Sequence, residues 1–285
     1  MSRAAGFAQL IRPINSFMMG IATVIGEIIA IRDLPSTNSM LLGFITAFFL
    51  TAASMVINDY YDRKVDEVNA PNRPLPSGTI SPNEALLFSI LLTIIGLISA
   101  SVTNLQCLLI AILGFGASFS YNTKGKETGL PGNLMVSVCV SLPFIYGGFI
   151  VSTFDTISVS IIIFSMMAFL SNMGREITKG IADVEGDRLR NIKTVAIRSG
   201  ARHAALTSVI FYFSAIALSL LPWILSSVTW VYLPIVLISD AGFIYSSVSL
   251  LKNSSQENSM RVKNLILIWM MLALIAIVIG GIANV

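Results

Sequence analysis

Apolar residues are gathered along this chain into nine long runs separated by shorter polar segments. Each run has about the 17 to 25 residues that an α-helix needs to cross a bilayer. The pattern predicts nine transmembrane helices at residues 14–32, 40–58, 84–103, 105–121, 131–152, 157–174, 203–222, 228–250 and 264–283.

The composition agrees with a membrane protein. Hydrophobic residues make up 55% of the chain and charged residues 12%, with a mean hydropathy of +0.81. No stretch is long and polar enough for a separate soluble domain, so we expect one transmembrane domain over residues 1–285. The first run lacks a small-residue cleavage site and is expected to be retained. We expect the protein to be surrounded by the lipid bilayer and to have no nucleic-acid partner.

The basic residues are distributed unevenly between the predicted loops. Every Lys and Arg except Arg32 lies in the N-terminal segment or in a loop that follows an even-numbered helix. The positive-inside rule then places the N-terminus and these loops in the cytosol and the C-terminus outside. The sequence therefore predicts a multi-pass protein of the cell membrane with a functional face toward the cytoplasm.

Two clusters of acidic residues lie in the two long cytosolic loops, at about 59–83 and 175–202. Function is often carried by long loops of this kind. Within each cluster the oxygen-bearing residues recur every four positions, which places them on one face of a helix. The candidate ligands are Asn58, Asp62 and Asp66 in the first cluster and Asp183 and Asp187 in the second.

These side chains suit a hard cation. Mg²⁺ prefers oxygen ligands and is usually held by a few carboxylates together with substrate phosphates. So many carboxylates in a partly dehydrated cleft would repel one another unless metal ions and a phosphate ligand joined them. We therefore expect a Mg²⁺-bound polyphosphate, with basic residues on its outer oxygens. Those residues are Arg63, Arg73, Lys126, Arg175 and Lys179.

Other interpretations of the acids are less favoured. A single cluster could be ordinary solvated charge at a helix end, but two clusters with the same spacing are harder to explain in that way. The first segment lacks the glycine turn and the terminal glutamate of an EF-hand. A cation transporter would place acids through the depth of the membrane, and a non-catalytic scaffold would have no need of them. An enzyme is the favoured class.

Some residues within the runs have two interpretations. Glu27 and Asp240 lie inside predicted helices, where they are either hydrogen-bonded structural carboxyls or substrate contacts. Cys107 and Cys139 are read as packing residues, and His203 is the only histidine, which argues against histidine chemistry.

Several segments together resemble the UbiA-type intramembrane prenyltransferases over nearly the whole chain. Residues 58–66 are similar to the first aspartate-rich motif of that family and residues 183–187 to the second. The accompanying segments are 11–15, 72–78, Tyr121 with Lys126, 129–133 and 175–179. Gly180 departs from the family pattern, because relatives often carry another acid after the lysine.

The resemblance implies a bundle of nine transmembrane helices whose central cavity opens to cytosolic cap loops and laterally to lipid. It implies Mg²⁺ as cofactor, held by Asn58, Asp62, Asp66, Asp183 and Asp187, of which the four aspartates are catalytic. The substrate-binding residues that it implies are Arg12, Asn15, Asp59, Arg63, Arg73, Tyr121, Lys126, Arg175 and Lys179.

Within the family, residues 126–133 and 175–187 most resemble archaeal members that attach the second geranylgeranyl chain of ether lipids. That implies geranylgeranyl diphosphate as donor and the free hydroxyl of geranylgeranylglyceryl phosphate as acceptor. A chlorophyllide-type or aromatic quinone-precursor acceptor is the alternative. Asp62, Asp66 or the departing diphosphate could take the acceptor proton. Arg12, Lys179 or the basic run at 188–193 could contact the acceptor phosphate.

Overall fold

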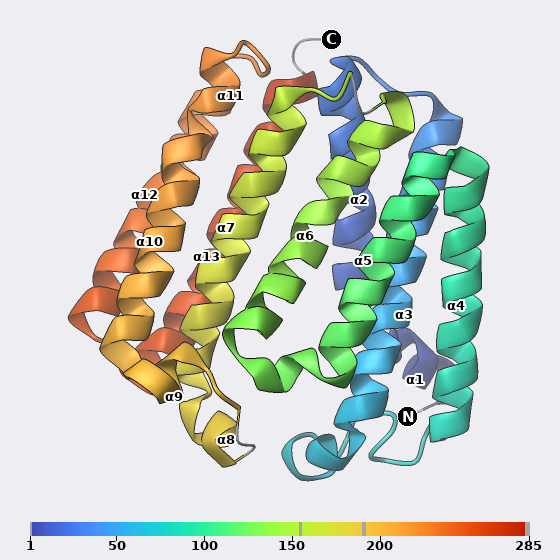
Figure 1. Cartoon of the computed structure of the whole chain (residues 1–285), viewed down its shortest axis with the longest axis vertical. Helices are drawn as coiled ribbons and strands as arrows, with labels where there is room; N and C mark the ends of the chain where they lie inside the picture. The colour runs from blue at the N-terminus through green and yellow to red at the C-terminus, as the bar shows by residue number, and fades with distance from the viewer. Residues whose placement is uncertain (1, 154–155, 190–191, 283–285) are drawn as a thin grey trace. The chain divides into compact units, whose positions relative to one another are not determined.

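The computed structural model describes residues 2–153, 156–189 and 192–282, and every regular element in these ranges is a helix (Figure 1). The all-α prediction is thereby confirmed for the described residues. The elements are α1 (Arg3–Leu10), α2 (Pro13–Ile31), α3 (Thr37–Asn69), α4 (Pro82–Thr103), α5 (Leu105–Thr123), the 3₁₀ turn η1 (Gly125–Thr128), α6 (Leu130–Val151), α7 (Val159–Ala182), α8 (Val184–Leu189), α9 (Val195–Ser199), α10 (Ala201–Ser219), α11 (Leu221–Ile224), α12 (Tyr232–Lys252) and α13 (Gln256–Ile282).

Eight segments in the described ranges are long and apolar enough to cross a membrane. They are α2, α3, α4, α5, α6, α10 with α11, α12 and α13. The ninth predicted run, 157–174, falls in α7, a helix of 24 residues whose C-terminal turns carry Arg175, Glu176 and Lys179. Eight of the nine predicted spans therefore correspond to helices with the composition of a membrane span.

The helix α3 is much longer than the predicted span at 40–58. Ser36 caps its N-terminus by accepting a hydrogen bond from the backbone N–H of Ser39. Neither Gly nor Pro occurs from residue 44 to residue 70, and the helix ends at Asn69, shortly before Pro71. The first part of the predicted loop 59–83 is therefore helical, and the first acid cluster lies on α3 itself.

The contacts within the chain define two compact units. The first contains residues 1–27, 35–123 and 143–156, and the second contains residues 28–34, 124–142 and 157–285. The single transmembrane domain expected over 1–285 stays a prediction.

The first unit is built around α3, α4 and α5, which pack against one another (Figure 1). Gly96 of α4 lies against Leu50 of α3, where an added Cβ would come within 2.7 Å of the leucine side chain. Close approach of this kind between membrane helices is typical of small residues. Leu10 from α1 and Ile80 from the α3–α4 loop are fully buried against these helices. The N-terminal segment and the loop are thereby packed against the end of α3 that carries the acids.

The second unit is built around α7, α10, α12 and α13 (Figure 1). Its core contains the fully buried Tyr212 of α10, whose hydroxyl lies 2.9 Å from the Thr178 hydroxyl of α7. Gly174 leaves the space that the Tyr212 ring occupies. This packing holds the C-terminal turns of α7, which carry the basic residues that precede the second acid cluster.

Candidate active site

The first acid cluster lies on one face of α3. Asn58, Asp62 and Asp66 are separated by single helical repeats of four residues. The amide nitrogen of Asn58 donates to Asp62 Oδ2 at 3.0 Å and to Asp59 Oδ1 at 3.5 Å. The three residues therefore lie on one face of a helix, as their spacing predicted.

Arg12 holds the buried carboxylate of Asp59. Its Nη2 atom lies 2.6 Å from Asp59 Oδ1, and Asp59 is only 5% exposed. Arg12 separates α1 from α2 and has a φ angle of +44°, which non-glycine residues seldom adopt. This turn directs the guanidinium to α3, whereas Asn15, in the first turn of α2, is exposed.

Arg73 binds the other end of the cluster from the α3–α4 loop. Its Nη1 atom donates to Asp66 Oδ2 at 2.7 Å and lies 3.7 Å from Asp59 Oδ1. Burial tends to lower the pKa of Arg73, but the hydrogen bond that Arg73 donates to Asp66 and the charges of Asp59, Asp66 and Asp62 outweigh burial and raise it. The guanidinium is therefore permanently charged beside three carboxylates.

Arg63 contacts Tyr60 on the same helix. Its Nη1 atom donates to the backbone carbonyl of Tyr60 at 3.0 Å, and its Cζ atom lies 4.8 Å from the centre of the Tyr60 ring. These are cation–π and backbone contacts rather than contacts with the carboxylates. Tyr121, also in the first unit, is half-buried near the end of α5.

The second acid cluster begins where α7 ends. Asp183 is the residue that follows α7, and its backbone N–H donates to the carbonyl of Lys179 at 2.9 Å. The N–H of Asp187 in turn donates to the Asp183 carbonyl at 2.9 Å. One helical turn therefore separates the two aspartates, as predicted, although α7 and α8 are separate helices.

Lys263 is a neighbour of this cluster that sequence reasoning did not select. Its Nζ atom lies 3.5 Å from Asp183 Oδ1, and its side chain is 15% exposed. Lys263 belongs to α13, eighty residues away in the chain, and nothing in the local sequence distinguishes it from other basic residues at helix ends. Only the packing of α13 against α7 brings it to the acid.

Glu176 was also missed, although it lies between two predicted phosphate-binding residues. Glu176 is 8% exposed, and its two oxygens accept from Arg175 Nη1 at 3.0 Å and from Lys179 Nζ at 3.3 Å. The Nε atom of Arg175 is buried and has no hydrogen-bond partner among the described residues. Glu176 lies three residues before Lys179, a spacing at which helical side chains meet, and this spacing was the signal in the sequence that could have identified the ion pair.

Lys126 belongs to the 3₁₀ turn η1, in the second unit. The same turn is joined to the segment after α8 by a hydrogen bond from the Lys193 N–H to the Glu127 carbonyl at 3.5 Å. Gly129, at φ +74°, leaves room for the Lys193 carbonyl, which would lie 2.1 Å from an added Cβ. In the basic run 188–193, Arg190 lies outside the described residues.

The two carboxyls inside predicted spans differ. Asp240 of α12 accepts a 2.7 Å hydrogen bond from the Ser219 hydroxyl, which favours the interpretation of a structural carboxyl. Glu27 of α2 is fully buried, and neither of its oxygens has a partner in the part of the chain that is described. Among the described residues neither Cys107 nor Cys139 forms a disulfide, which agrees with their interpretation as packing residues.

The donor set suits Mg²⁺ in a particular way. Within the described residues, no group of three His, Cys, Asp or Glu side chains is close enough to hold a metal ion. The predicted ligands are oxygen donors, and Asp59 and Asp66 are already engaged by arginines. Such a set fits a cation that takes one or two carboxylates and completes its shell with water and phosphate oxygens, which is the usual behaviour of Mg²⁺.

The helices and clusters define a class of protein: an all-helical membrane protein with acid-rich and arginine-rich helix ends suited to a metal-bound phosphate. The family profile of the UbiA prenyltransferases matches residues 19–282, and the chain belongs to this family. It is therefore an integral membrane prenyltransferase, and the transporter and scaffold interpretations are set aside.

Individual relatives agree with this assignment. The chain is 32% identical over 278 residues to the digeranylgeranylglyceryl phosphate synthase of Thermococcus sibiricus, with 98% of each chain covered. A solved structure from work on digeranylgeranylglyceryl phosphate synthase in membranes has a TM-score of 0.84 at 32% identity, covering 99% of this chain and 100% of that one. A UbiA homologue from Archaeoglobus fulgidus, bound to GPP and Mg²⁺, has a TM-score of 0.69 at 18% identity, with 96% and 99% covered. The last comparison shows the shared fold.

Proposed function

We propose that this protein transfers a geranylgeranyl group from geranylgeranyl diphosphate to the free hydroxyl of geranylgeranylglyceryl phosphate. The products are an ether, the second of an archaeal membrane lipid, and diphosphate. The observation that carries the proposal is the full-length similarity to synthases named for this product. The resemblance of residues 126–133 and 175–187 to the same archaeal enzymes is the local part of this similarity.

The donor's diphosphate is assigned to both acid clusters. Asn58, Asp62 and Asp66 from the first cluster and Asp183 and Asp187 from the second would hold Mg²⁺, and the chemistry of these oxygen donors supports that role. The homologue bound to GPP and Mg²⁺ supports it too. When bound, Mg²⁺ neutralises the diphosphate and makes it a better leaving group.

The residues of this chain orient and stabilise the leaving group. Arg12 and Arg73 hold Asp59 and Asp66 in fixed positions on α3, so these carboxylates need little reorganisation when the donor binds. Arg175 and Lys179 are held by Glu176 and present positive charge, and the unpartnered Nε of Arg175 is a donor suited to a phosphate oxygen.

The reaction breaks the bond between the allylic carbon and the diphosphate oxygen and forms a bond from that carbon to the acceptor oxygen. The acceptor proton passes to a base, for which Asp62, Asp66 and the departing diphosphate are the candidates. Lys126 and Tyr121 are proposed as further donor contacts. Arg12, Lys179 and the run 188–193 are proposed for the acceptor phosphate.

The proposed topology has nine membrane spans, because α7 is counted in addition to the eight apolar segments. It also has a central cavity that opens to the cytosol and laterally to lipid. The N-terminus and both clusters face the cytoplasm of a cell-membrane protein. Support comes from the placement of every Lys and Arg except Arg32 on one predicted side. The polar end of α7 would then lie at the cytoplasmic boundary.

The purified full chain with Mg²⁺ tests this function. Geranylgeranyl diphosphate is offered together with geranylgeranylglyceryl phosphate, a hydroxybenzoate and a chlorophyllide, and the products are identified by mass spectrometry. We expect the ether lipid and stoichiometric diphosphate. A prenylated aromatic or chlorophyllide product in place of the ether would refute the acceptor while retaining the reaction class, and no transfer to any acceptor would refute both.

A further inference from the structure

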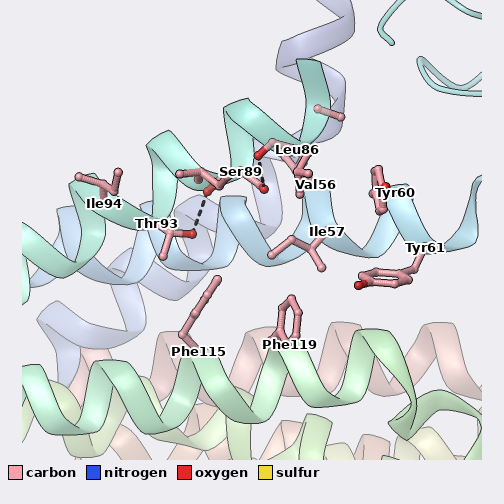
Figure 2. Close-up of a pocket in the computed structure, with 12 residues that line it drawn as sticks. Val56, Ile57, Tyr60, Tyr61, Leu86, Ser89, Thr93, Ile94, Phe115 and Phe119 are labelled. Carbon is pink, nitrogen blue, oxygen red and sulfur yellow. Dashed lines mark hydrogen bonds between the residues drawn. The ribbon is translucent and has the colours of Figure 1, made fainter. Parts of the chain in front are cut away.

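An apolar groove runs along the first unit between α3, α4 and α5 (Figure 2). Its volume is about 290 Å³, near the lower end of the range for ligand pockets. Ile57 and Tyr61 line it from α3, and Phe115 and Phe119 project into it from α5. The lining residues of α4 are Ala85, Leu86, Ser89, Ile90, Thr93 and Ile94. The size suits a segment of one hydrocarbon chain rather than a complete lipid.

The two hydroxyls that α4 presents to the groove already have partners. The Ser89 hydroxyl donates to the Leu86 carbonyl at 2.7 Å, and the Thr93 hydroxyl donates to the Ser89 carbonyl at 2.8 Å, both within α4 (Figure 2). The remaining lining is aliphatic or aromatic, and its other polar side-chain atoms are the Tyr60 and Tyr61 hydroxyls on α3. Because a mostly apolar site holds water poorly, its natural occupant is apolar.

The groove is open along its length. Ile90, Ile94 and Phe119 are 48%, 49% and 44% exposed and form an outward-facing rim, whereas Val56 and Ile57 are buried at its base. With a rise of 1.5 Å per residue, the lining stretch of α4 extends over roughly 13 Å. The groove is therefore an elongated slot that can take an extended chain lengthwise from the bilayer.

This slot is distinct from the proposed donor site, although both use α3. Val56 and Tyr60 line the groove, and each lies two residues before a candidate ligand, Asn58 and Asp62 respectively. Two residues correspond to a rotation of roughly 200° around a helix, so the groove side chains and the ligands point to nearly opposite faces.

One end of the groove carries positive charge. The Arg63 guanidinium lies over the Tyr60 ring, 4.8 Å from its centre. Lys64 is exposed and lies seven residues after Ile57, on the same face of α3. The exposed Glu67 lies nearly a turn beyond Lys64. Because α3 has 33 residues and about 20 suffice to cross the hydrocarbon core, Tyr60 and Lys64 belong at the level of the lipid head groups.

We infer that the groove binds one hydrocarbon chain of an anionic phospholipid from the surrounding bilayer, with the lipid phosphate beside Lys64 and Arg63. The hydrocarbon chain fills the slot between α3, α4 and α5. The head group lies beside Arg63 and Lys64, where Arg63 contacts the Tyr60 ring. A bound lipid would thereby support the helix that carries the first acid cluster, from the side away from the reaction.

The full chain in detergent tests the inference with photoactivatable lipids. A phosphatidylglycerol with a diazirine in one chain is cross-linked and the labelled peptides are mapped. We expect labelling concentrated in α4 residues 85–94 and around Phe115, and its loss on addition of excess unlabelled phosphatidylglycerol. In Thr93→Phe the added ring fills the groove and removes most of the label. Leu87→Phe, on the 67%-exposed outer face of α4, is the matched control and retains it.

A separate experiment tests the position of the lipid head group. Lys64→Gln should lower phosphatidylglycerol labelling roughly fivefold, the equivalent of about 1 kcal/mol for one cation at an anionic surface, and leave phosphatidylcholine labelling unchanged. Label spread evenly over the lipid-facing helices, or equal labelling by both lipids, would overturn the inference. A cross-linked dimer through the groove in place of lipid label would also overturn it. Competition in the unsubstituted chain keeps the test decisive if Thr93→Phe does not fold.

Discussion

The Arg73 guanidinium donates a 2.7 Å hydrogen bond to the carboxylate of Asp66, seven residues earlier in the chain. The bond joins the last turns of α3 to the loop that follows and neutralises part of an otherwise repulsive acid cluster. A double-mutant cycle of Asp66→Asn and Arg73→Gln measures it. We expect the two changes to be non-additive in thermal stability, with a coupling of about 0.5–3 kcal/mol. Additive effects would mean that the pair contributes nothing to the fold.

Asp62→Asn should abolish most prenyl transfer, because it removes a charged oxygen ligand while retaining the shape of the side chain. Glu67→Gln is its matched control on the same helix, since Glu67 is exposed and lies outside the carboxylate face. Transfer of labelled geranylgeranyl groups is measured over a range of Mg²⁺ concentrations. Equal activity of the two variants would contradict the assignment of the first cluster.

The same comparison applies to the second cluster. Asp187→Asn should reduce transfer strongly, whereas Glu185→Gln, exposed on the same short helix α8, should have little effect. Both variants change one carboxylate to an amide within a distance of two residues, so a general loss of negative charge is controlled. If Glu185→Gln were the more damaging change, the proposed metal ligands would be wrong.

Glu176→Gln should weaken donor binding without removing catalysis. The change keeps the side-chain shape but removes the charge that holds Arg175 and Lys179, so these cations are less well positioned. We expect the KM for the diphosphate to rise roughly tenfold, equivalent to about 1.4 kcal/mol, with a smaller change in kcat. Glu127→Gln, exposed in η1, serves as the control. A fall in kcat alone would argue instead for a direct role in the chemical step.

Lys263→Met should change the dependence on Mg²⁺. The Lys263 ammonium lies 3.5 Å from an oxygen of Asp183 and competes electrostatically with a divalent cation at that carboxylate. Its removal should lower the Mg²⁺ concentration for half-maximal activity several-fold. Arg261→Gln, on the exposed face of the same helix, should leave this concentration unchanged. A higher requirement in Lys263→Met would indicate that the lysine binds the diphosphate.

Gly147→Ala tests the packing of the first unit. An added Cβ at Gly147 of α6 would lie 2.0 Å from the backbone carbonyl of Thr23, so the helices must separate, and we expect stability to fall by about 1–3 kcal/mol. Gly116→Ala in α5 meets nothing within 4 Å and should be neutral or slightly stabilising. Thermal unfolding in detergent distinguishes them, and similar midpoints would show that the close approach is not required.

The sequence alone was sufficient to predict the helices, the shared face of the first acid cluster and the family. The lengths of the apolar runs predicted helices because a bilayer leaves no other way to pair the backbone of a single span. The four-residue spacing of Asn58, Asp62 and Asp66 predicted a common face, since helical periodicity is a local property. Ordered motifs along the chain predicted the UbiA family, which the family profile confirms.

Only the tertiary structure identified the ion-pair partners that come from distant segments of the chain. Lys263 reaches Asp183 only because α13 packs against α7, and Arg12 reaches Asp59 only through the strained turn between α1 and α2. The contact of Arg63 with the Tyr60 ring is likewise seen only in the structure, and the expected role of Arg63 at the diphosphate stays a prediction. The groove beside α3 is made by three helices whose apolar residues look alike in sequence. Spacing along a helix follows from local geometry, whereas ion-pair partners and cavities depend on how side chains from distant segments pack together.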